Sequence, residues 1–468
     1  MRRVLLSVAL AVFTFAIALP LNAQIKLLAV GSLTQSKAGT YADLSGLHNT
    51  LENGVKANLL GGMGSAITYA SGNTFLALPD RGPNAVSFDS LIDDTASYIP
   101  RFHTITMDLT PSKSTVLPYS LTPTLRNTTI LFSLTPLVYG SGQGLGLGSG
   151  IPPQNNFFQH FFSGRSDNFD PKQNSGNPRA ARLDPEGIRL SNDGFSVFIS
   201  DEYGPYVYEF NRLTGVRVRA LKLPDHLFVS NLSPVGQTEI DGNLSGRVAN
   251  KGMEGLAITP DGRTLVGIMQ NALIQDAADG GDAKKLLRIV TIDIFTGKTK
   301  EFAYLLTTGS GVSEILALNQ HEFLVDERDG KGRGNGSKAK IKQIFKIDLA
   351  NAVDISNMAG SEAATHAVSK TLFLDIVAVL SAPPLSLDVK QIPAKLEGIS
   401  FGPDIAQGQQ KIHTFWVAND NDFLSTVDAG NGDGTTFDNP NQFYVFGFTD
   451  ADLGGSKYVP QPQRWSRW

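Results

Sequence analysis

The chain contains no cysteine, and charged residues make up only 18% of its 468 positions. The absence of Cys excludes disulfides, a thiol nucleophile and lipid attachment at a cysteine, so a large apolar core must hold the fold together. The seven His are scattered without an H-E-x-x-H motif, and no G-x-S-x-G elbow occurs. The usual signatures of zinc proteases and α/β-hydrolases are therefore excluded, whereas a Ser triad assembled by geometry is not.

Long apolar runs are also missing, apart from one near the start. Met1-Arg2-Arg3 is positively charged, Val4 to Leu19 is apolar, and Pro20 to Ala23 ends the run. This order is typical of a secretory signal peptide over residues 1–23, and the run is short for a membrane anchor. We expect a secreted or periplasmic chain with no integral membrane segment after cleavage. Its formal charge of 38 − 44 = −6, without Arg2 and Arg3, argues against nucleic acid as a partner.

Turn-forming residues are plentiful, with 47 Gly and 24 Pro. The stretch from Asp184 to Pro224 contains four short apolar strands separated by turn signals such as Asn192-Asp193-Gly194. A four-stranded antiparallel meander is the unit of a β-propeller blade. The pattern recurs at the segments that begin near Gly64, Glu254, Glu314 and Glu397.

These repeats predict an all-β fold, a single propeller domain over residues 24–468. Five blades are visible, and the 122 residues between 64 and 186 leave space for a sixth, so we expect six. The same gap holds a polar, Gly-rich insertion at 139–182. The last strand, Gln442 to Phe448, needs an outer partner, and Ile25 to Val30 would supply it and close the ring.

Acidic residues begin the repeats, and further acidic clusters follow their second strands. Because neighbouring strands are antiparallel, the start of one lies beside the end of the next, so both sets are expected at one end of the channel. Gathered carboxylates repel one another unless Arg or a bound cation neutralises them. Oxygen ligands without His or Cys suit Ca²⁺. The expected calcium ligands are Glu186, Asp201, Glu254, Glu397 and Asp420; the alternative is a structural network of turns and ion pairs.

Basic residues beside this acidic mouth suit a small-molecule anionic substrate such as a phosphate ester. Arg81 and Arg328 are the candidate anion clamps, and Glu202 or Glu327 is the candidate general base. Two other classes fit the same features. One is a non-catalytic propeller that recognises a glycan, peptide or protein, and the other is a lactonase or sugar oxidoreductase.

Several motifs resemble those of the phytase-like family, described as having esterase-like activity of phytase. They are Asp80-Arg81-Gly82-Pro83-Asn84, Glu186-Gly187-Ile188, Asp201-Glu202-Tyr203-Gly204-Pro205, Lys251 to Leu256, Glu327-Arg328-Asp329 and Asn419 to Phe423. The resemblance extends over about Gln24 to Thr449. It implies an exported, calcium-dependent β-propeller that acts as an ester or phosphoester hydrolase.

Overall fold

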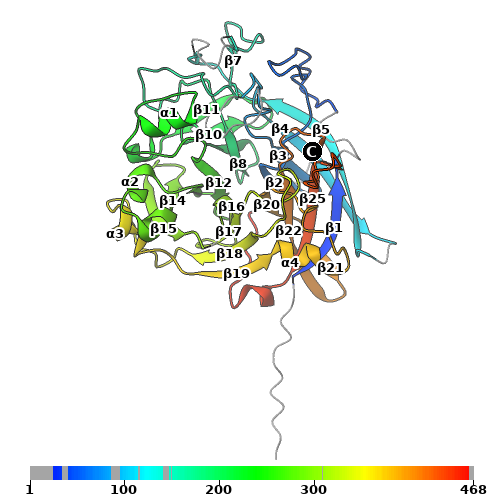
Figure 1. Ribbon diagram of the computed structural model, residues 1–468. Coiled ribbons are helices and arrows are strands. Elements are labelled where there is room, and N and C mark those ends of the chain that lie inside the picture. The colour runs from blue at the N-terminus through cyan, green and yellow to red at the C-terminus, as the bar shows by residue number, and fades with distance from the viewer. Residues whose placement is uncertain are drawn as a thin grey trace, which may run out of the picture.

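The computed structural model describes residues 25–33, 41–85, 95–113, 116–140, 147–148, 150–307 and 309–462. The expected signal peptide at 1–23 lies outside these residues. Five four-stranded antiparallel sheets surround a central axis (Figure 1). Their innermost strands contact one another in a closed ring, so the described part of the chain is a five-bladed β-propeller.

The blades follow one another along the chain, and the strands of each are named from the innermost to the outermost. Blade 1 is β2 (Ala66–Ser71), β3 (Thr74–Leu78), β4 (Arg101–Pro111) and β5 (Tyr119–Ile130). Blade 2 is β8 (Pro185–Leu190), β9 (Ser196–Asp201), β10 (Tyr206–Asn211) and β11 (Arg217–Leu221). Blade 3 is β12 (Met253–Ile258), β13 (Thr264–Met269), β14 (Leu286–Asp293) and β15 (Thr299–Leu305). Blade 4 is β16 (Gly311–Ala317), β17 (Glu322–Arg328), β18 (Lys342–Asp348) and β19 (Lys370–Asp375). Blade 5 is β20 (Leu396–Phe401), β22 (Gln410–Asn419), β25 (Gln442–Phe448) and β1 (Lys26–Ser32).

The remaining elements are short and lie in the connections. The strands are β6 (Phe132–Ser133), β7 (His160–Phe161), β21 (Ile405–Gln407), β23 (Thr426–Asp428) and β24 (Thr436–Asp438). The helices are η1 (Asp225–Leu227), α1 (Gly236–Asp241), α2 (Ile274–Ala277), η2 (Gly281–Lys285), α3 (Gly360–Ala364), α4 (Ile376–Ser381) and η3 (Asp450–Leu453). No helix in the described ranges is long and apolar enough to cross a bilayer.

Ring closure by the N-terminal strand is confirmed. Strand β1 pairs antiparallel with β25, from Lys26 opposite Gly447 to Ser32 opposite Gln442. Figure 1 shows the first and last strands of the chain side by side. The last blade therefore combines the two ends of the described chain, which covers the edge that β25 would otherwise expose.

The expectation of a sixth blade is wrong. The described residues between blades 1 and 2 form longer outer strands and loops instead. Strands β4 and β5 extend over 11 and 12 residues, and the connection beyond them contains only the two-residue strands β6 and β7. A long loop and a degenerate repeat give the same spacing in sequence, so the gap itself did not distinguish them.

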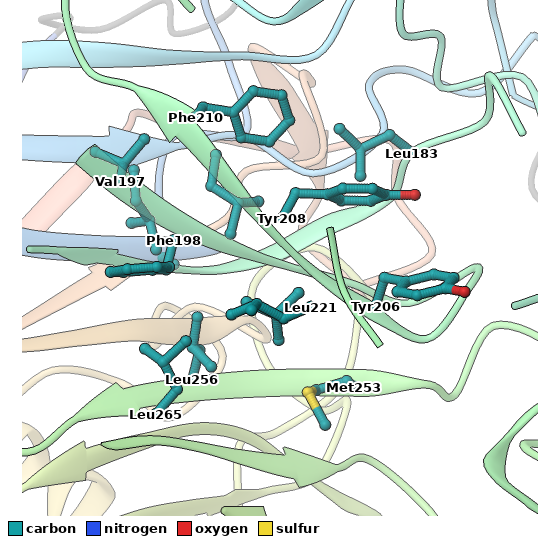
Figure 2. Packing of buried hydrophobic residues seen from close by; sticks show 14 of the residues in the cluster. Leu183, Val197, Phe198, Tyr206, Tyr208, Phe210, Leu221, Met253, Leu256 and Leu265 are labelled. Atoms are coloured by element: carbon teal, nitrogen blue, oxygen red, sulfur yellow. The ribbon is translucent and has the colours of Figure 1, made fainter. Parts of the chain in front are cut away.

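The core consists of side chains packed between adjacent blades. In blade 2, β9 and β10 each contain three consecutive buried apolar or aromatic residues, as expected of strands covered on both faces, and Gly194 (φ +76°) forms the tight turn before β9. Figure 2 shows Val197, Phe198 and Leu221 of blade 2 near Met253, Leu256 and Leu265 of blade 3. This packing holds the inner strands at a constant distance from the axis, which is what places their first residues around one opening.

Candidate functional site

Irregular pairing at the start of the inner strands turns three glutamates toward the channel. The pairing of β12 with β13 shifts between Met253 and Gly255, which leaves Glu254 as the extra residue. The same shift in β20 leaves Glu397 unpaired, and a larger one in β8 leaves Glu186 and Gly187. A β-bulge redirects the side chain of its extra residue. Glu186, Glu254 and Glu397 all line one cavity of about 170 Å³ at this end of the channel.

Blade 4 departs from this pattern by one position. Its shift falls between Val312 and Glu314, so the extra residue is Ser313, and Glu314 occupies the position that Gly255 and Gly398 hold in blades 3 and 5. Glu314, which begins the fourth repeat, therefore does not turn toward the cavity as the other three glutamates do. The glycine is needed in blade 3, because a Cβ on Gly255 would lie 2.7 Å from the Cα of Glu314.

A second ring of side chains stands at the ends of the second strands. All five blades contribute to the cavity through Asp80, Glu202, Gln270, Arg328 and Asp420. Lys251 and Lys395, which precede strands β12 and β20, line it too. The two rings together enclose a small, strongly polar space in which acidic residues outnumber basic ones.

Most of the predicted site residues meet in this cavity. Its lining includes Arg81, Glu186, Glu202, Glu254, Arg328, Glu397 and Asp420. The expectation that both acidic sets share one end of the channel thus describes the observed geometry. The catalytic and metal-binding roles given to these residues remain predictions.

Asp201 and Glu327 do not line the cavity. Each lies one residue before a member of the second ring, and strand alternation turns its side chain away. The Asp201 carboxylate accepts the backbone amides of Asp184, Tyr203 and Gly204, each at 3.1 Å, and so holds the turn after β9. Glu327 accepts the hydroxyl of Tyr304 at 2.5 Å and pairs with Lys370. These contacts engage both carboxylates outside the cavity, and the ligand role of Asp201 and the base role of Glu327 stay predictions.

The basic residues neutralise one side of the cavity. Arg328 pairs with Glu397 and donates from Nε to the Ser313 hydroxyl at 2.5 Å. Lys395 pairs with Asp420 at 2.8 Å and also with Asp422. Serine at the bulge of blade 4 leaves room for the Arg328 side chain to reach the next blade. Sequence reasoning missed Lys395, because a lysine just before a strand carries no distinguishing signal.

The other side of the cavity gathers acids without equal compensation. Carboxylate oxygens of Asp184, Glu186 and Glu202 all lie within 4.8 Å of one another. Arg81 pairs with Asp184 at 2.8 Å, while Oε2 of Glu254 has no hydrogen-bond partner among the described residues. This set of oxygens matches the preference of Ca²⁺ for carboxylate ligands. Asp184 was missed, although it directly precedes the Pro185-Glu186 start of β8.

Burial and mutual repulsion shift the acid equilibria of these groups. Burial, followed by the neighbouring Glu254 carboxylate, raises the pKa of both Glu186 and Glu202 well above the usual range. Burial raises the pKa of Glu397 to about 7, although Arg328 and Lys395 lower it. Perturbed carboxylic acids that line a cavity are characteristic of sites that exchange protons or hold a cation.

Backbone strain occurs at the same wall. Asn250 and Asp422 line the cavity, and both adopt left-handed backbone conformations, with φ of 55° and 51°. Such conformations are unfavourable for residues other than glycine and cluster at binding sites. The Asn250 amide oxygen accepts a hydrogen bond from Arg81, so this strained residue helps to position the arginine beside Asp184.

A buried ion pair closes the channel beneath the cavity. Arg189 of β8 contacts Glu314 at 2.9 Å, and both residues are inaccessible or nearly so. The Arg189 guanidinium also donates to main-chain carbonyls on the inner strands of four of the five blades. The acceptors are the carbonyl oxygens of Ile67 (2.9 Å), Ile188 (2.7 Å), Ile315 (3.0 Å) and Ile399 (3.4 Å). The guanidinium therefore lies at the axis and separates the acidic cavity from the far half of the channel.

Comparisons with known proteins identify the family of the chain. The model of the phytase-like family, described as esterase-like activity of phytase, matches residues 58–423. An uncharacterized secreted protein of Arthroderma benhamiae is 33% identical over 182 residues, which is 32% of this chain and 35% of that protein. The match thus spans about a third of the relative's length.

Solved structures with a similar arrangement are remote. A putative 6-phosphogluconolactonase from Bacteroides uniformis is 12% identical with a TM-score of 0.32, covering 84% of this chain and 92% of its own. The hydrazine synthase of Kuenenia stuttgartiensis is 12% identical with a TM-score of 0.31, covering 81% of this chain and 80% of its own. At these values neither structure bears on the function of the chain.

Proposed function

The chain belongs to the phytase-like family, and from this premise we propose that it is an exported hydrolase of phosphate or carboxylate esters that works at the acidic mouth of the propeller. The observation that carries the proposal is the close pair of Glu202 and Glu254, which are only 2% and 3% exposed and line the cavity with Arg328 and Lys395. Two adjacent buried carboxyl groups cannot both ionise easily, so they share a proton near neutral pH.

A pair of carboxyl groups that shares one proton suits ester hydrolysis. The ionised member of the Glu202–Glu254 pair accepts a proton from the attacking water, and the protonated member returns one to the leaving oxygen. We assign the base role to Glu202, whose Oε1 is held by the amide of Gly252 at 3.1 Å. Glu254 is its proton partner, because the two carboxyl groups interact and Oε2 of Glu254 has no hydrogen-bond partner among the described residues.

The remaining groups position the ester. Arg328 and Lys395 bring positive charge to the cavity wall, where anionic oxygens of the substrate would compete with Glu397 and Asp420 for them. Asp184 and Glu186, beside Glu202, are the residues that would hold Ca²⁺. When bound, a divalent cation supplies positive charge that polarises the ester oxygen and offsets the charge of the transition state.

The test is hydrolysis of p-nitrophenyl phosphate and p-nitrophenyl acetate by chelator-treated protein with and without added Ca²⁺. We expect turnover of at least one ester, and Glu202→Gln should lower kcat by about 10²- to 10⁴-fold, as loss of a general base does. Glu209→Gln is the matched control, since Glu209 pairs with Arg219 at the surface of β10, away from the cavity. Calcium binding without turnover of either ester would favour a non-catalytic binding propeller. Equal activity of Glu202→Gln and wild type would refute the assigned role.

A further inference from the structure

The far half of the channel contains a second cavity, of about 360 Å³. Arg189 forms part of its lining and separates it from the acidic cavity. Residues 458–461, which we call the C-terminal strap, line its outer side. The strap is attached by Val459, whose amide donates to Leu318 O at 2.9 Å, and by Gln461, whose Nε2 donates to Leu190 O at 2.7 Å. The space is therefore a chamber between the strap and the buried arginine.

The chamber lining contains both polar and apolar surface, and its apolar part is partly aromatic. The ring of Tyr458 lies 4.3 Å from that of Phe401, and Tyr69, Ile258 and Leu316 complete the apolar lining. The Ser400 hydroxyl is already engaged, because it accepts the Tyr69 amide at 3.0 Å and donates to Phe401 O at 2.8 Å. These walls suit the body of a small organic molecule more than a hydrated ion.

One polar atom at the chamber is left without a partner. Arg189 is 2% exposed, and its Nε has no hydrogen-bond partner among the described residues, although both terminal nitrogens are fully used. A buried donor without an acceptor is unfavourable and calls for one. Arg189 Nε therefore needs one acceptor atom, such as a single oxygen of a bound ligand.

Charge balance indicates that the acceptor is an anion. Glu314 is the carboxylate that contacts Arg189, and burial raises its pKa to about 8 although Arg189 lowers it, so at neutral pH it balances the guanidinium charge only in part. Asp404 is the acidic residue of the chamber lining, and it is taken by His413 and Lys411, each at 2.7 Å. A buried guanidinium without a counter-charge is costly.

We propose that this chamber binds a small organic carboxylate, with one carboxylate oxygen at Nε of Arg189 and the apolar body against Tyr69, Phe401 and Tyr458. A single free N–H donor matches a carboxylate, whereas phosphate needs several donors to replace its hydration. The site does not depend on the proposed ester hydrolysis, because it lies on the opposite side of the Arg189–Glu314 pair.

The test is calorimetric titration of the full chain at pH 7 with benzoate, with benzamide as the uncharged analogue of the same shape and with inorganic phosphate. We expect benzoate to bind with a Kd of about 1 mM or lower. Benzamide should bind at least about tenfold more weakly, because it lacks the charge that strengthens the hydrogen bond to Arg189. Phosphate should not bind in the chamber.

A variant locates the binding. Thr68 lines the chamber at the position of β2 that corresponds to Arg189 in β8. The larger side chain in Thr68→Phe should fill the chamber and abolish benzoate binding. Thr122→Phe, at an exposed position of the outer strand β5, is the matched control and should bind as wild type does.

Three results would overturn the proposal. They are no heat of binding with benzoate, equal affinity for benzamide and benzoate, and unchanged benzoate binding in a folded Thr68→Phe protein. Binding of phosphate in place of benzoate would likewise exclude an organic ligand. The comparison of the three probes uses wild-type protein, so it decides the question even if Thr68→Phe fails to fold.

Discussion

Removal of Arg189 should destabilise the whole propeller, although the residue does not lie beside the candidate general base. In Arg189→Met, four inner-strand carbonyls lose their donor and Glu314 loses its cationic partner. Breaking a buried pair by removing one member costs about 3–5 kcal/mol, and we expect about 3 because the raised pKa of Glu314 already leaves it partly protonated and lets it complete its protonation once Arg189 is gone. For the 468 − 23 = 445 residues of the mature chain, the entropy of unfolding is about 0.9 kcal/mol/K, so Tm should fall by about 3 °C.

The assay is scanning calorimetry of wild type, Arg189→Met and the exposed control Arg179→Met. The control should change the free energy of unfolding by no more than about 0.5 kcal/mol. Glu314→Gln should cost less in the Arg189→Met background than in wild type, because the two residues form one interacting pair. Arg189→Ala leaves space at the axis, and low concentrations of guanidinium should partly restore its Tm. If Arg189→Met melts together with Arg179→Met, the carbonyl ring does not contribute as described.

Three further predictions concern the rim and the closure of the ring. Without a divalent cation, the free energy of unfolding should fall as pH rises from about 5 to 8. The reason is that carboxylates such as Glu397 keep protons in the folded state that the unfolded state has already lost. Between its unfolded-state and folded-state pKa values, each such group contributes about 1.4 kcal/mol per pH unit. Calorimetry checks this, and a Tm that rises over the same range would contradict it. Added Ca²⁺ should raise Tm, with about 2.7 kcal/mol of stabilisation when its free concentration is a hundredfold above its Kd. Glu254→Gln should weaken this response. If chelation leaves Tm unchanged, the acidic residues form a structural network without calcium. Deletion of residues 25–30 should lower Tm by about 5 °C or more by circular dichroism, because it removes most of β1 and exposes the edge of β25; an unchanged melting curve would refute this role of β1.

Much of the fold follows from local patterns in the sequence. Alternating apolar residues and turns such as Asn192-Asp193-Gly194 predict the four strands of blade 2, and the unpartnered strand Gln442–Phe448 predicts closure by the N-terminal segment. These features are determined by neighbours in the chain, through side-chain alternation and backbone preference. Local patterns did not determine the number of blades, because a long loop and a weak repeat of the same length cannot be distinguished by spacing in the sequence.

Some features of the candidate site are likewise set by consecutive residues, and others depend on the strand register in the folded structure. The recurring Glu-Gly pair correctly selects Glu186, Glu254 and Glu397, because the bulge that redirects these side chains is built from consecutive residues. The position of Glu314 depends on where the bulge of blade 4 falls, and a shift of one residue turns a side chain to the opposite face of a strand.

Only the tertiary structure decided which charges meet. Lys395 lines the cavity and Asp184 joins the acidic cluster beside it, whereas Asp201 and Glu327 face elsewhere, according to partners contributed by other turns and strands. The same holds for Arg189, which is one basic residue of an ordinary strand in sequence but the axial contact of four inner strands in the fold. Burial and Coulomb interactions depend on distance in space, and the closed ring brings together residues that lie more than a hundred positions apart along the chain.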